Sequence, residues 1–265
     1  MGLLVSLLPL LAASTQASTS DGVVWHWDPD SAGCDLQQDV GDDRTVVAIS
    51  RTPGNDQTVL KIKGSKPIRS AQREFQGGTI AFEPAGSTES EITVVEGYDG
   101  RREISAVSYD PDFMTKFGQS TEVDFTHQKV GQIKVAITAP KAAIDAIRIC
   151  EDAKMREWGV DPVAWRSLAV KPKPLTPPDK WFSYLDYPDR EKIYKNDITV
   201  VARLDLSADG SVQKCTVVNG PPAEFIPAVC NPLRRNAKLQ PARDVSGKGT
   251  PAPYVVQVTF GAFLL

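Results

Sequence analysis

A proline-rich stretch, KPKPLTPP at residues 171–178, limits most strongly what this chain can fold into. Proline fixes φ at about −65° and lacks a backbone N–H, so the stretch suits neither an α-helix nor a central β-strand. It should be a stiff, extended spacer of about 3 Å per residue, although a ligand for a proline-binding partner is an alternative. We therefore predict a linker at 161–179 between one domain at 23–160 and a second at 180–265.

The chain begins with a stretch typical of a secretory signal peptide, MGLLVSLLPLLAASTQA. Its apolar run, Leu3 to Ala13, has about eleven residues and is too short to span a bilayer. Small residues around Ala17 suit cleavage there, but no Lys or Arg precedes the run, so a buried or disordered tail is the alternative. We predict a signal peptide at 1–17, an exported mature chain, and no later membrane-spanning segment.

Four cysteines follow the leader: Cys34, Cys150, Cys215 and Cys230. In an oxidising compartment an even number of cysteines indicates disulfides, and four cysteines allow three pairings. The chain has no Cys-x-x-Cys redox motif. Its two histidines lie far apart, whereas zinc sites draw their ligands from close pairs. Disulfides are therefore favoured over redox or metal-binding roles.

The pairing of the cysteines can be predicted from the pattern around them. PKAAIDAIRICEDAKMREWG, beginning at Pro140, has apolar residues at steps of three and four, which predicts an amphipathic helix. Cys150 lies on its apolar face and Cys34 lies near the first strand. We predict a Cys34–Cys150 bridge that ties the last helix of the first domain to its first strand, which leaves Cys215 and Cys230 to pair with each other.

The first domain is predicted to be strand-rich. Short runs of β-branched and apolar residues, bounded by turn residues, indicate strands, and Asp99-Gly100 indicates a hairpin. One short helix is expected from Asp110. The clearest strand predictions lie at 45–50, 58–63, 79–82 and 130–138.

The second domain has a pattern of its own. Residues 198–206 and 253–260 alternate between apolar and polar positions, which predicts strands with one buried face. Ser-Ala-Asp-Gly predicts a turn that leads to a return strand at 211–219. Pro227 and Pro232 should divide the helical segment that follows into two short pieces, because proline is unfavourable inside a helix. The fold class predicted for the whole chain is α+β.

This part of the chain has the order strand, turn, strand, helix, loop and strand. Its distinctive features are Tyr187-Pro188, Asp209-Gly210, the helix, Gln240-Pro241-Ala242, Gly247 and the last strand. In this order and spacing they resemble the C-terminal domain of TonB, the energy transducer of Gram-negative bacteria. The match covers roughly residues 180–263, and it implies a small α/β sandwich and a periplasmic location.

The resemblance implies a binding mode. The TonB C-terminal domain adds an extended segment of an outer-membrane transporter beside its final strand, and main-chain hydrogen bonds supply the affinity. A sheet edge covered by the C-terminal tail GAFLL is the alternative, because exposed edges are normally protected. The receiving edge would be Tyr254, Val255, Val256, Gln257, Val258, Thr259 and Phe260, of which Val255, Gln257 and Thr259 should face outward.

The chain also departs from a working TonB transducer. Its leader is short, and the eight-residue spacer reaches some 25 Å at about 3 Å per residue. The fold is therefore expected to be kept without energy transduction. A net charge of −3 does not suggest nucleic acid as a partner, and no Gly-x-Ser-x-Gly motif occurs.

We predict a non-enzymatic, periplasmic binding protein without a cofactor or metal. Its partner would be an envelope protein, with an outer-membrane receptor segment as one candidate. A structural or accessory envelope protein is the second hypothesis, and an enzyme centred on the first domain is the third.

Overall fold

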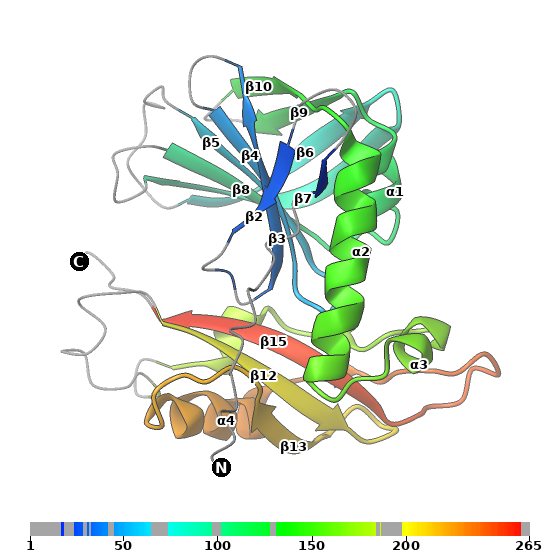
Figure 1. Cartoon of the computed structure of the whole chain (residues 1–265). Helices are drawn as coiled ribbons and strands as arrows, with labels where there is room; N and C mark the ends of the chain where they lie inside the picture. Colours follow the sequence, from blue (N-terminus) through cyan, green and yellow to red (C-terminus); the bar gives the residue numbers. More distant parts are fainter. Residues whose placement is uncertain are drawn as a thin grey trace, which may run out of the picture.

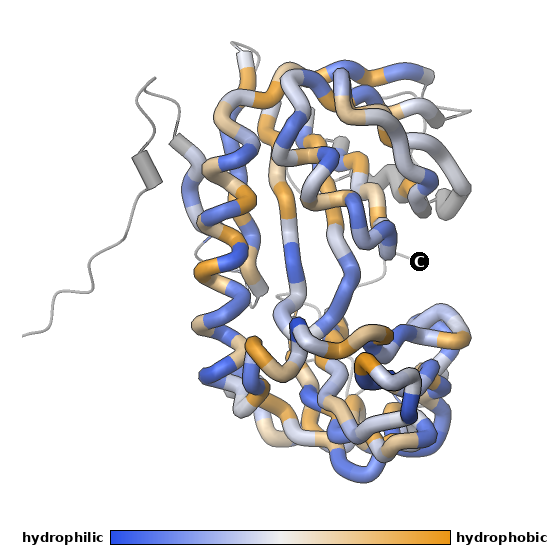
Figure 2. The backbone as a smooth tube through the Cα atoms, turned by 90° about the vertical axis from the view of Figure 1, so that its right-hand side faces the viewer, coloured by the Kyte–Doolittle hydropathy of each residue, from blue (hydrophilic) through white to orange (hydrophobic). Residues whose placement is uncertain are grey.

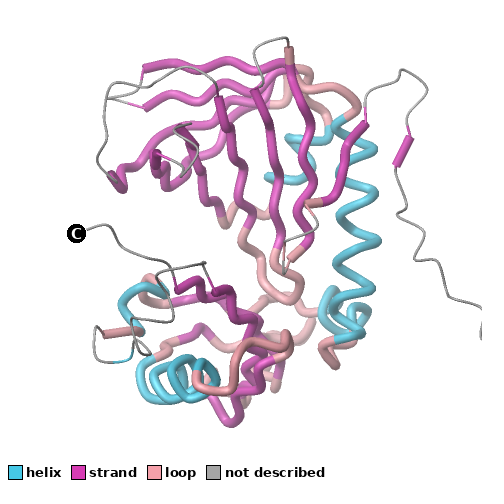
Figure 3. The backbone as a smooth tube through the Cα atoms, turned by 60° about the vertical axis from the view of Figure 1, so that its left-hand side comes forward, coloured by secondary structure: helices cyan, strands magenta, loops and turns pink. Residues whose placement is uncertain are grey.

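The computed structural model contains two main sheets connected by a long helix (Figures 1 and 3), and a two-stranded sheet accompanies the smaller of them. The α+β prediction is confirmed, because antiparallel sheets and separate helices make up both parts of the chain. The residues described by the structure are 17–18, 24–28, 31, 33–41, 45–64, 74–96, 102–127, 131–183, 186 and 198–260.

The N-terminal part is a ten-stranded sheet with the order β1-β2-β3-β4-β5-β8-β7-β6-β9-β10. All of its strand pairings are antiparallel, and all four strand regions predicted here from the sequence are strands. The strands are β1 (Ala17–Ser18), β2 (Val24–Trp27), β3 (Cys34–Val40), β4 (Thr45–Arg51), β5 (Thr58–Gly64), β6 (Glu74–Glu83), β7 (Gly86–Glu96), β8 (Arg102–Ser108), β9 (Glu122–His127) and β10 (Gly131–Ala136).

Two helices pack against this sheet, the short α1 (Phe113–Gly118) and the long α2 (Pro140–Glu157). Both were expected from the sequence. Hydrophobic and hydrophilic residues alternate along the turns of the long helix in Figure 2. The apolar side of α2 buries Ala143, Ile144 and Ile147 in the same core as the inward residues of the strands.

The C-terminal part is a three-stranded sheet with the order β13-β12-β15, covered on one face by helix α4. Alternate residues of β12 point into this core, including Val200, Ala202 and Leu204, as the sequence pattern predicts. The elements are β12 (Ile198–Leu206), β13 (Val212–Val217), α4 (Phe225–Asn236) and β15 (Ala252–Phe260).

Helix α4 is a single helix, whereas two short helical pieces were expected, so this expectation is wrong. Pro227 lies in its first turn, where backbone N–H groups lack partners within the helix in any case. Pro232 lies inside the helix and is buried. Packing of Phe225, Val229 and Leu233 on the sheet outweighs the hydrogen bond that Pro232 cannot make.

Both predicted disulfides are formed. Cys34 of β3 joins Cys150 of α2 with a Cα–Cα distance of 5.9 Å, and Cys215 of β13 joins Cys230 of α4 at 5.6 Å. The first bridge fastens α2 to the N-terminal sheet, and the second fastens α4 to the C-terminal sheet.

The segment expected to be a free spacer is packed against the C-terminal part. It contains the short helix α3 (Pro162–Ser167), the strand β11 (Lys173–Pro174) and the 3-10 helix η1 (Pro178–Trp181). Strand β11 pairs with β14 (Leu239–Gln240), and its single proline, Pro174, is tolerated because each strand has just two residues. The domain limits themselves remain a prediction.

The two parts of the molecule are in contact through a small apolar cluster at the end of α2. Figure 1 shows α2 running from the upper sheet down to the lower one. There Met155, Trp158 and Trp165 pack against Val201 and Val255 of the C-terminal sheet. The face of this sheet opposite α4 is therefore partly covered, which the sequence pattern does not reveal.

Some of the predicted features lie outside the described residues. These are positions 1–16 of the leader, the Asp99-Gly100 turn, the Tyr187-Pro188 motif and the C-terminal tail at 261–265. Among the helices that the structure describes, none combines the length and the apolar character needed to cross a bilayer.

Candidate binding edge on the C-terminal sheet

Strand β15 forms one edge of the C-terminal sheet and pairs along its whole length with β12. In an antiparallel pair, alternate residues direct their N–H and C=O groups toward the partner strand. The N–H of Val255 bonds outside the sheet, so Val255 is a residue whose backbone groups point away from β12. By the same alternation Gln257 and Thr259 also direct their backbone groups outward.

The outer edge of β15 is covered at Val255 by the connection between β4 and β5. The Val255 N–H donates to the C=O of Gly54 at 3.1 Å, and the Asn55 side-chain amide donates to the Val255 C=O at 3.0 Å. A longer contact of 3.5 Å joins the hydroxyl of Thr52 to the side-chain oxygen of Gln257. We call residues 52–57 the capping loop.

The expectation that Val255 faces outward into solvent is wrong, because the capping loop lies against this residue. The Val255 side chain does lie on the face opposite the α4 core, but it is fully buried. Part of this burial comes from Gly54, because a Cβ built on Gly54 would lie 2.7 Å from Cγ2 of Val255. Gly54 has a φ of +81°, so glycine suits this position for both its backbone conformation and its close contact.

Arg51, the last residue of β4, holds the capping loop in shape. Its guanidinium group donates to the C=O of Asp56 at 3.0 Å, to the C=O of Gln57 at 3.1 Å and to the hydroxyl of Thr58 at 2.7 Å. Within the loop, the side-chain oxygen of Asn55 accepts a bond of 2.6 Å from the Gln57 N–H. The loop is therefore a compact turn with its own hydrogen bonds.

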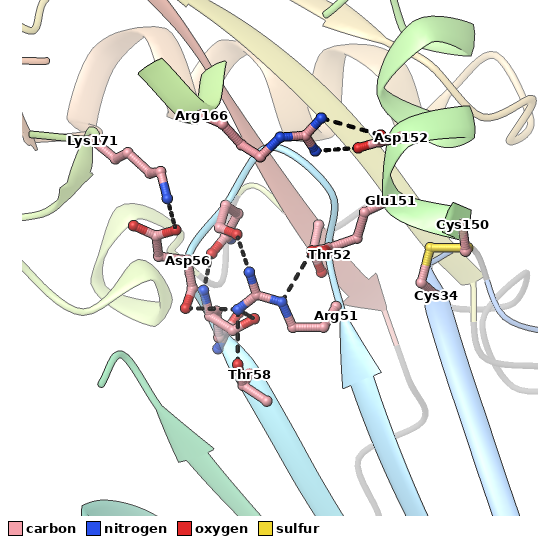
Figure 4. A network of polar contacts seen from close by, with 12 residues as sticks. Cys34, Arg51, Thr52, Asp56, Thr58, Cys150, Glu151, Asp152, Arg166 and Lys171 are labelled. Carbon is pink, nitrogen blue, oxygen red and sulfur yellow. Dashed lines mark hydrogen bonds and ion pairs between the residues drawn. A yellow bond between two sulfur atoms is a disulfide. The ribbon is translucent and has the colours of Figure 1, made fainter. Parts of the chain in front are cut away.

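The same arginine connects the capping loop to helix α2 (Figure 4). The Arg51 Nε donates to the Glu151 carboxylate at 3.0 Å, and each side chain is 13% exposed. Arg51 is also the pairing partner of Cys34 across β3 and β4, and Cys150 precedes Glu151 on α2. The disulfide and the ion pair thus form two adjacent bridges between the sheet and the helix.

A second ion pair, 3.1 Å long, joins Asp56 of the loop to Lys171 of the linker segment. Both side chains are about one-third exposed, so this pair contributes little to stability compared with the buried Arg51–Glu151 pair.

Tyr254 lies beside the capped position and faces the α4 core. Its hydroxyl group accepts a 3.4 Å hydrogen bond from the Asn55 amide. Burial raises the pKa of Tyr254 above its ordinary value, because the phenolate would lose its hydration. This tyrosine is therefore neutral near neutral pH.

The predicted edge residues divide into two sets. Tyr254, Val256 and Phe260 are buried and Val258 is half-buried, so these four belong to the core side of the strand. Gln257 and Thr259 are exposed. For their outward backbone groups, the described part of the chain provides no backbone hydrogen-bond partner.

The sequence pattern does not indicate that the capping loop belongs to this site. The residues TPGND at 52–56 are typical of a turn, and the predicted strands on either side of them also imply a turn. A turn signal predicts that the chain reverses direction there. It carries no information about contact with a strand about 200 residues further along the chain.

Nothing in the described ranges indicates a metal site, because no group of three or more His, Cys, Asp or Glu side chains is positioned to hold an ion. The site is built from backbone groups, one amide side chain and apolar contacts.

Comparison with known families agrees with this geometry. Residues 183–261 match the family described as Gram-negative bacterial TonB protein C-terminal, which confirms the resemblance predicted for this third of the chain. The matched range contains β12, β13, α4 and β15 but neither the capping loop nor α2. Searches of curated proteins and of solved structures found no match. The C-terminal part is thus a module similar to the TonB C-terminal domain, which is a periplasmic domain of Gram-negative bacteria.

Proposed function

We propose that this protein is a periplasmic binding protein whose C-terminal module captures an extended segment of an envelope protein by strand addition at β15. The observation that carries the proposal is the outer edge of this strand. Gln257 and Thr259 present outward N–H and C=O groups with no backbone partner among the described residues. No residue of β15 is charged, so the strand lacks the lysine that often protects a sheet edge.

A partner segment would lie beside β15 and exchange backbone hydrogen bonds with it. Each such bond contributes about 0.5–1.5 kcal/mol net, so several in a row are needed for useful affinity. Side chains at alternate positions of the segment would contact the two faces of the sheet and supply specificity. A periplasm-facing segment of an outer-membrane receptor is one partner class that the family match supports.

A second candidate function is that of an accessory envelope protein that uses the module as a packing unit. The coverage of Val255 by Gly54 and Asn55 favours this alternative, because a capped edge is the usual form of protection. The two functions differ in whether another protein ever contacts the edge.

Site-specific photocrosslinking in the producing bacterium tests the proposal. A benzophenone side chain replaces Thr259, which is exposed on β15, and in a matched control it replaces Gln213, which is exposed on the opposite edge strand β13. Strand addition predicts a discrete adduct with an envelope protein from position 259 and none from 213. An equal yield at both positions, or no adduct at either, would favour the packing-unit function.

A further inference from the structure

The capping loop occupies one of the three outward-facing positions that β15 offers between Val255 and Thr259. Strands in proteins usually pair over three to ten residues, about five being typical. With Val255 occupied, Gln257 and Thr259 alone give a pairing surface that is short for strand addition. A partner segment that pairs along the strand therefore needs the Val255 position as well.

The contact between the loop and Val255 imitates one rung of a β-ladder. In a hydrogen-bonded antiparallel pair, two facing residues exchange both of their N–H···O bonds. Here Gly54 supplies the acceptor for the Val255 N–H, and the Asn55 side chain supplies the donor for the Val255 C=O. An incoming strand would offer the same donor and acceptor, so it can replace the loop without leaving the N–H or C=O of Val255 unpaired.

The bonds that shape the loop are independent of β15. The guanidinium of Arg51 bonds the loop from the β4 side, and the Asn55 oxygen bonds the Gln57 N–H inside the loop. Displacing the loop therefore breaks two hydrogen bonds to the backbone of β15 and two longer ones to the Tyr254 and Gln257 side chains, and it leaves the internal ones in place. This separation of bonds suits a segment that opens as a unit.

We propose that residues 52–57 are a displaceable cap on the binding edge. In the chain without a partner, the cap forms hydrogen bonds with the backbone of Val255. A partner segment displaces the cap and then pairs with Val255, Gln257 and Thr259. The inference rests on the proposed function, because it needs a partner at β15. It goes beyond that function by assigning to the N-terminal part of the chain the control of access to the edge.

A pair of glycine substitutions separates the cap contact from simple backbone strain. Gly54→Ala places a methyl group against the buried Val255 side chain and should push the loop away. Gly131→Ala is the matched control, since Gly131 has a φ of +83° against +81° for Gly54, but a Cβ added to it would meet no atom within 4 Å. Both changes introduce the same kind of backbone strain. Asn55→Ala, which removes the donor to Val255, is the second cap variant if Gly54→Ala does not fold.

The test measures the same full-length, oxidised variants in two ways. Hydrogen exchange of the Val255 amide reports how often the cap opens, and the yield of the adduct from a benzophenone at position 259 reports access to the edge. Apparent affinity scales with the fraction of open molecules. We expect about tenfold faster exchange in Gly54→Ala or Asn55→Ala, and an adduct yield that rises by the same factor until it saturates. Gly131→Ala should change neither.

Two results would overturn the inference while leaving the proposed function intact. One is an adduct of equal yield in wild type and cap variants although Val255 exchanges faster. The other is that wild type gives an adduct but neither cap variant changes the exchange rate of the Val255 amide. Absence of an adduct from every variant would instead refute the proposed function, and the cap would then have no access to control.

Discussion

The two edges of the C-terminal sheet are protected in different ways. Strand β13 has six residues, includes the exposed Lys214 and is fastened to α4 by the Cys215–Cys230 disulfide. Strand β15 has nine residues, none of them charged, and its cover comes from a loop of the other part of the chain.

This difference indicates what each edge can do. Protection by a lysine and a disulfide belongs to the strand itself and stays in place as long as the module is folded. Protection of β15 by two hydrogen bonds comes from a separate loop, which our proposal treats as removable while the module stays folded. The proposal thus assigns reversible contact with a partner to the β15 edge.

Removing the Cys34–Cys150 bridge should have the largest effect, because it fastens the helix that supports the cap. The bridge spans 116 residues, and a loop of that size corresponds to about 4–5 kcal/mol in the chain-entropy model. Cys34→Ser/Cys150→Ser should lower the free energy of unfolding by this amount and should speed exchange at Val255. Denaturant unfolding and hydrogen exchange measure the two effects.

The other disulfide provides the comparison. Its 15-residue separation corresponds to about 3 kcal/mol, so Cys215→Ser/Cys230→Ser should destabilise the module on the β13 side. Exchange at Val255 should then change no more than exchange in the rest of the C-terminal sheet. A selective increase at Val255 in this variant would contradict the separate protection of the two edges.

Glu151→Ala should have the next largest effect, because it leaves the largely buried Arg51 guanidinium without its carboxylate partner. We expect a loss of about 2–3 kcal/mol in unfolding free energy, the range for hydrogen bonds to charged groups. Loosening of Arg51 should also open the cap more often. Thermal or denaturant unfolding, with exchange at Val255, checks both expectations.

Asp152→Ala is the control for this substitution. Asp152 neighbours Glu151 on α2 but pairs with Arg166, and the Arg166 side chain is half-exposed. The hydrogen bond from Arg166 holds the pKa of Asp152 below its ordinary value. An exposed pair contributes about 0–1 kcal/mol, so this variant should be nearly as stable as wild type, with unchanged Val255 exchange. Equal effects of the two substitutions would argue against a specific role of Glu151.

Two proline substitutions in β15 test the direction of its backbone groups. The N–H of Val258 points toward β12, so Val258→Pro removes a ladder bond and should cost about 1–3 kcal/mol. The N–H of Gln257 points outward, so Gln257→Pro should cost about 1 kcal/mol or less and still abolish the adduct at position 259. The measurements are unfolding free energy and adduct yield. A larger stability loss for Gln257→Pro than for Val258→Pro would show that the directions are reversed.

The smallest effect expected is a pH dependence from the hairpin between β12 and β13. Hydrogen bonds from Ser207 and from the Ser211 N–H lower the pKa of Asp209 from 3.8 to about 2. Because the folded pKa is the lower one, the carboxylate stabilises the fold above pH 4, and this contribution is lost as the pH falls from about 4 to about 2. Asp209→Asn should remove this part of the acid destabilisation in unfolding measured across that range. An unchanged pH profile in the variant would refute the assignment.

Patterns of neighbouring residues predicted most of the fold. The alternation in β12, the three- and four-residue steps in α2 and the turn residues between strands each describe local structure, and the structure confirms them. Both disulfide pairings followed from where the cysteines lie in these elements. Local sequence patterns were enough to predict these elements, because an element that buries one face has a residue spacing typical of a helix or of a strand.

Contacts between distant segments could not be predicted in this way. The burial of Val201 and Val255 depends on the position of Trp158 and Trp165 from the end of α2, and the cap depends on Gly54 and Asn55. Every one of these residues also fits a local role in a strand, helix or turn. The one-piece helix α4 was missed for a related reason, because tertiary packing outweighed the cost of Pro232.

Residue-resolved hydrogen exchange of the wild-type chain tests most directly whether the β15 edge is capped at one end and open at the other. We predict slow exchange at the amides of Tyr254 and Val256, which point toward β12, and intermediate exchange at Val255 under the cap. We predict fast exchange at Gln257 and Thr259. Protection of Gln257 and Thr259 equal to that of Val256 would contradict a half-open edge, because the whole edge would then be covered in the resting protein.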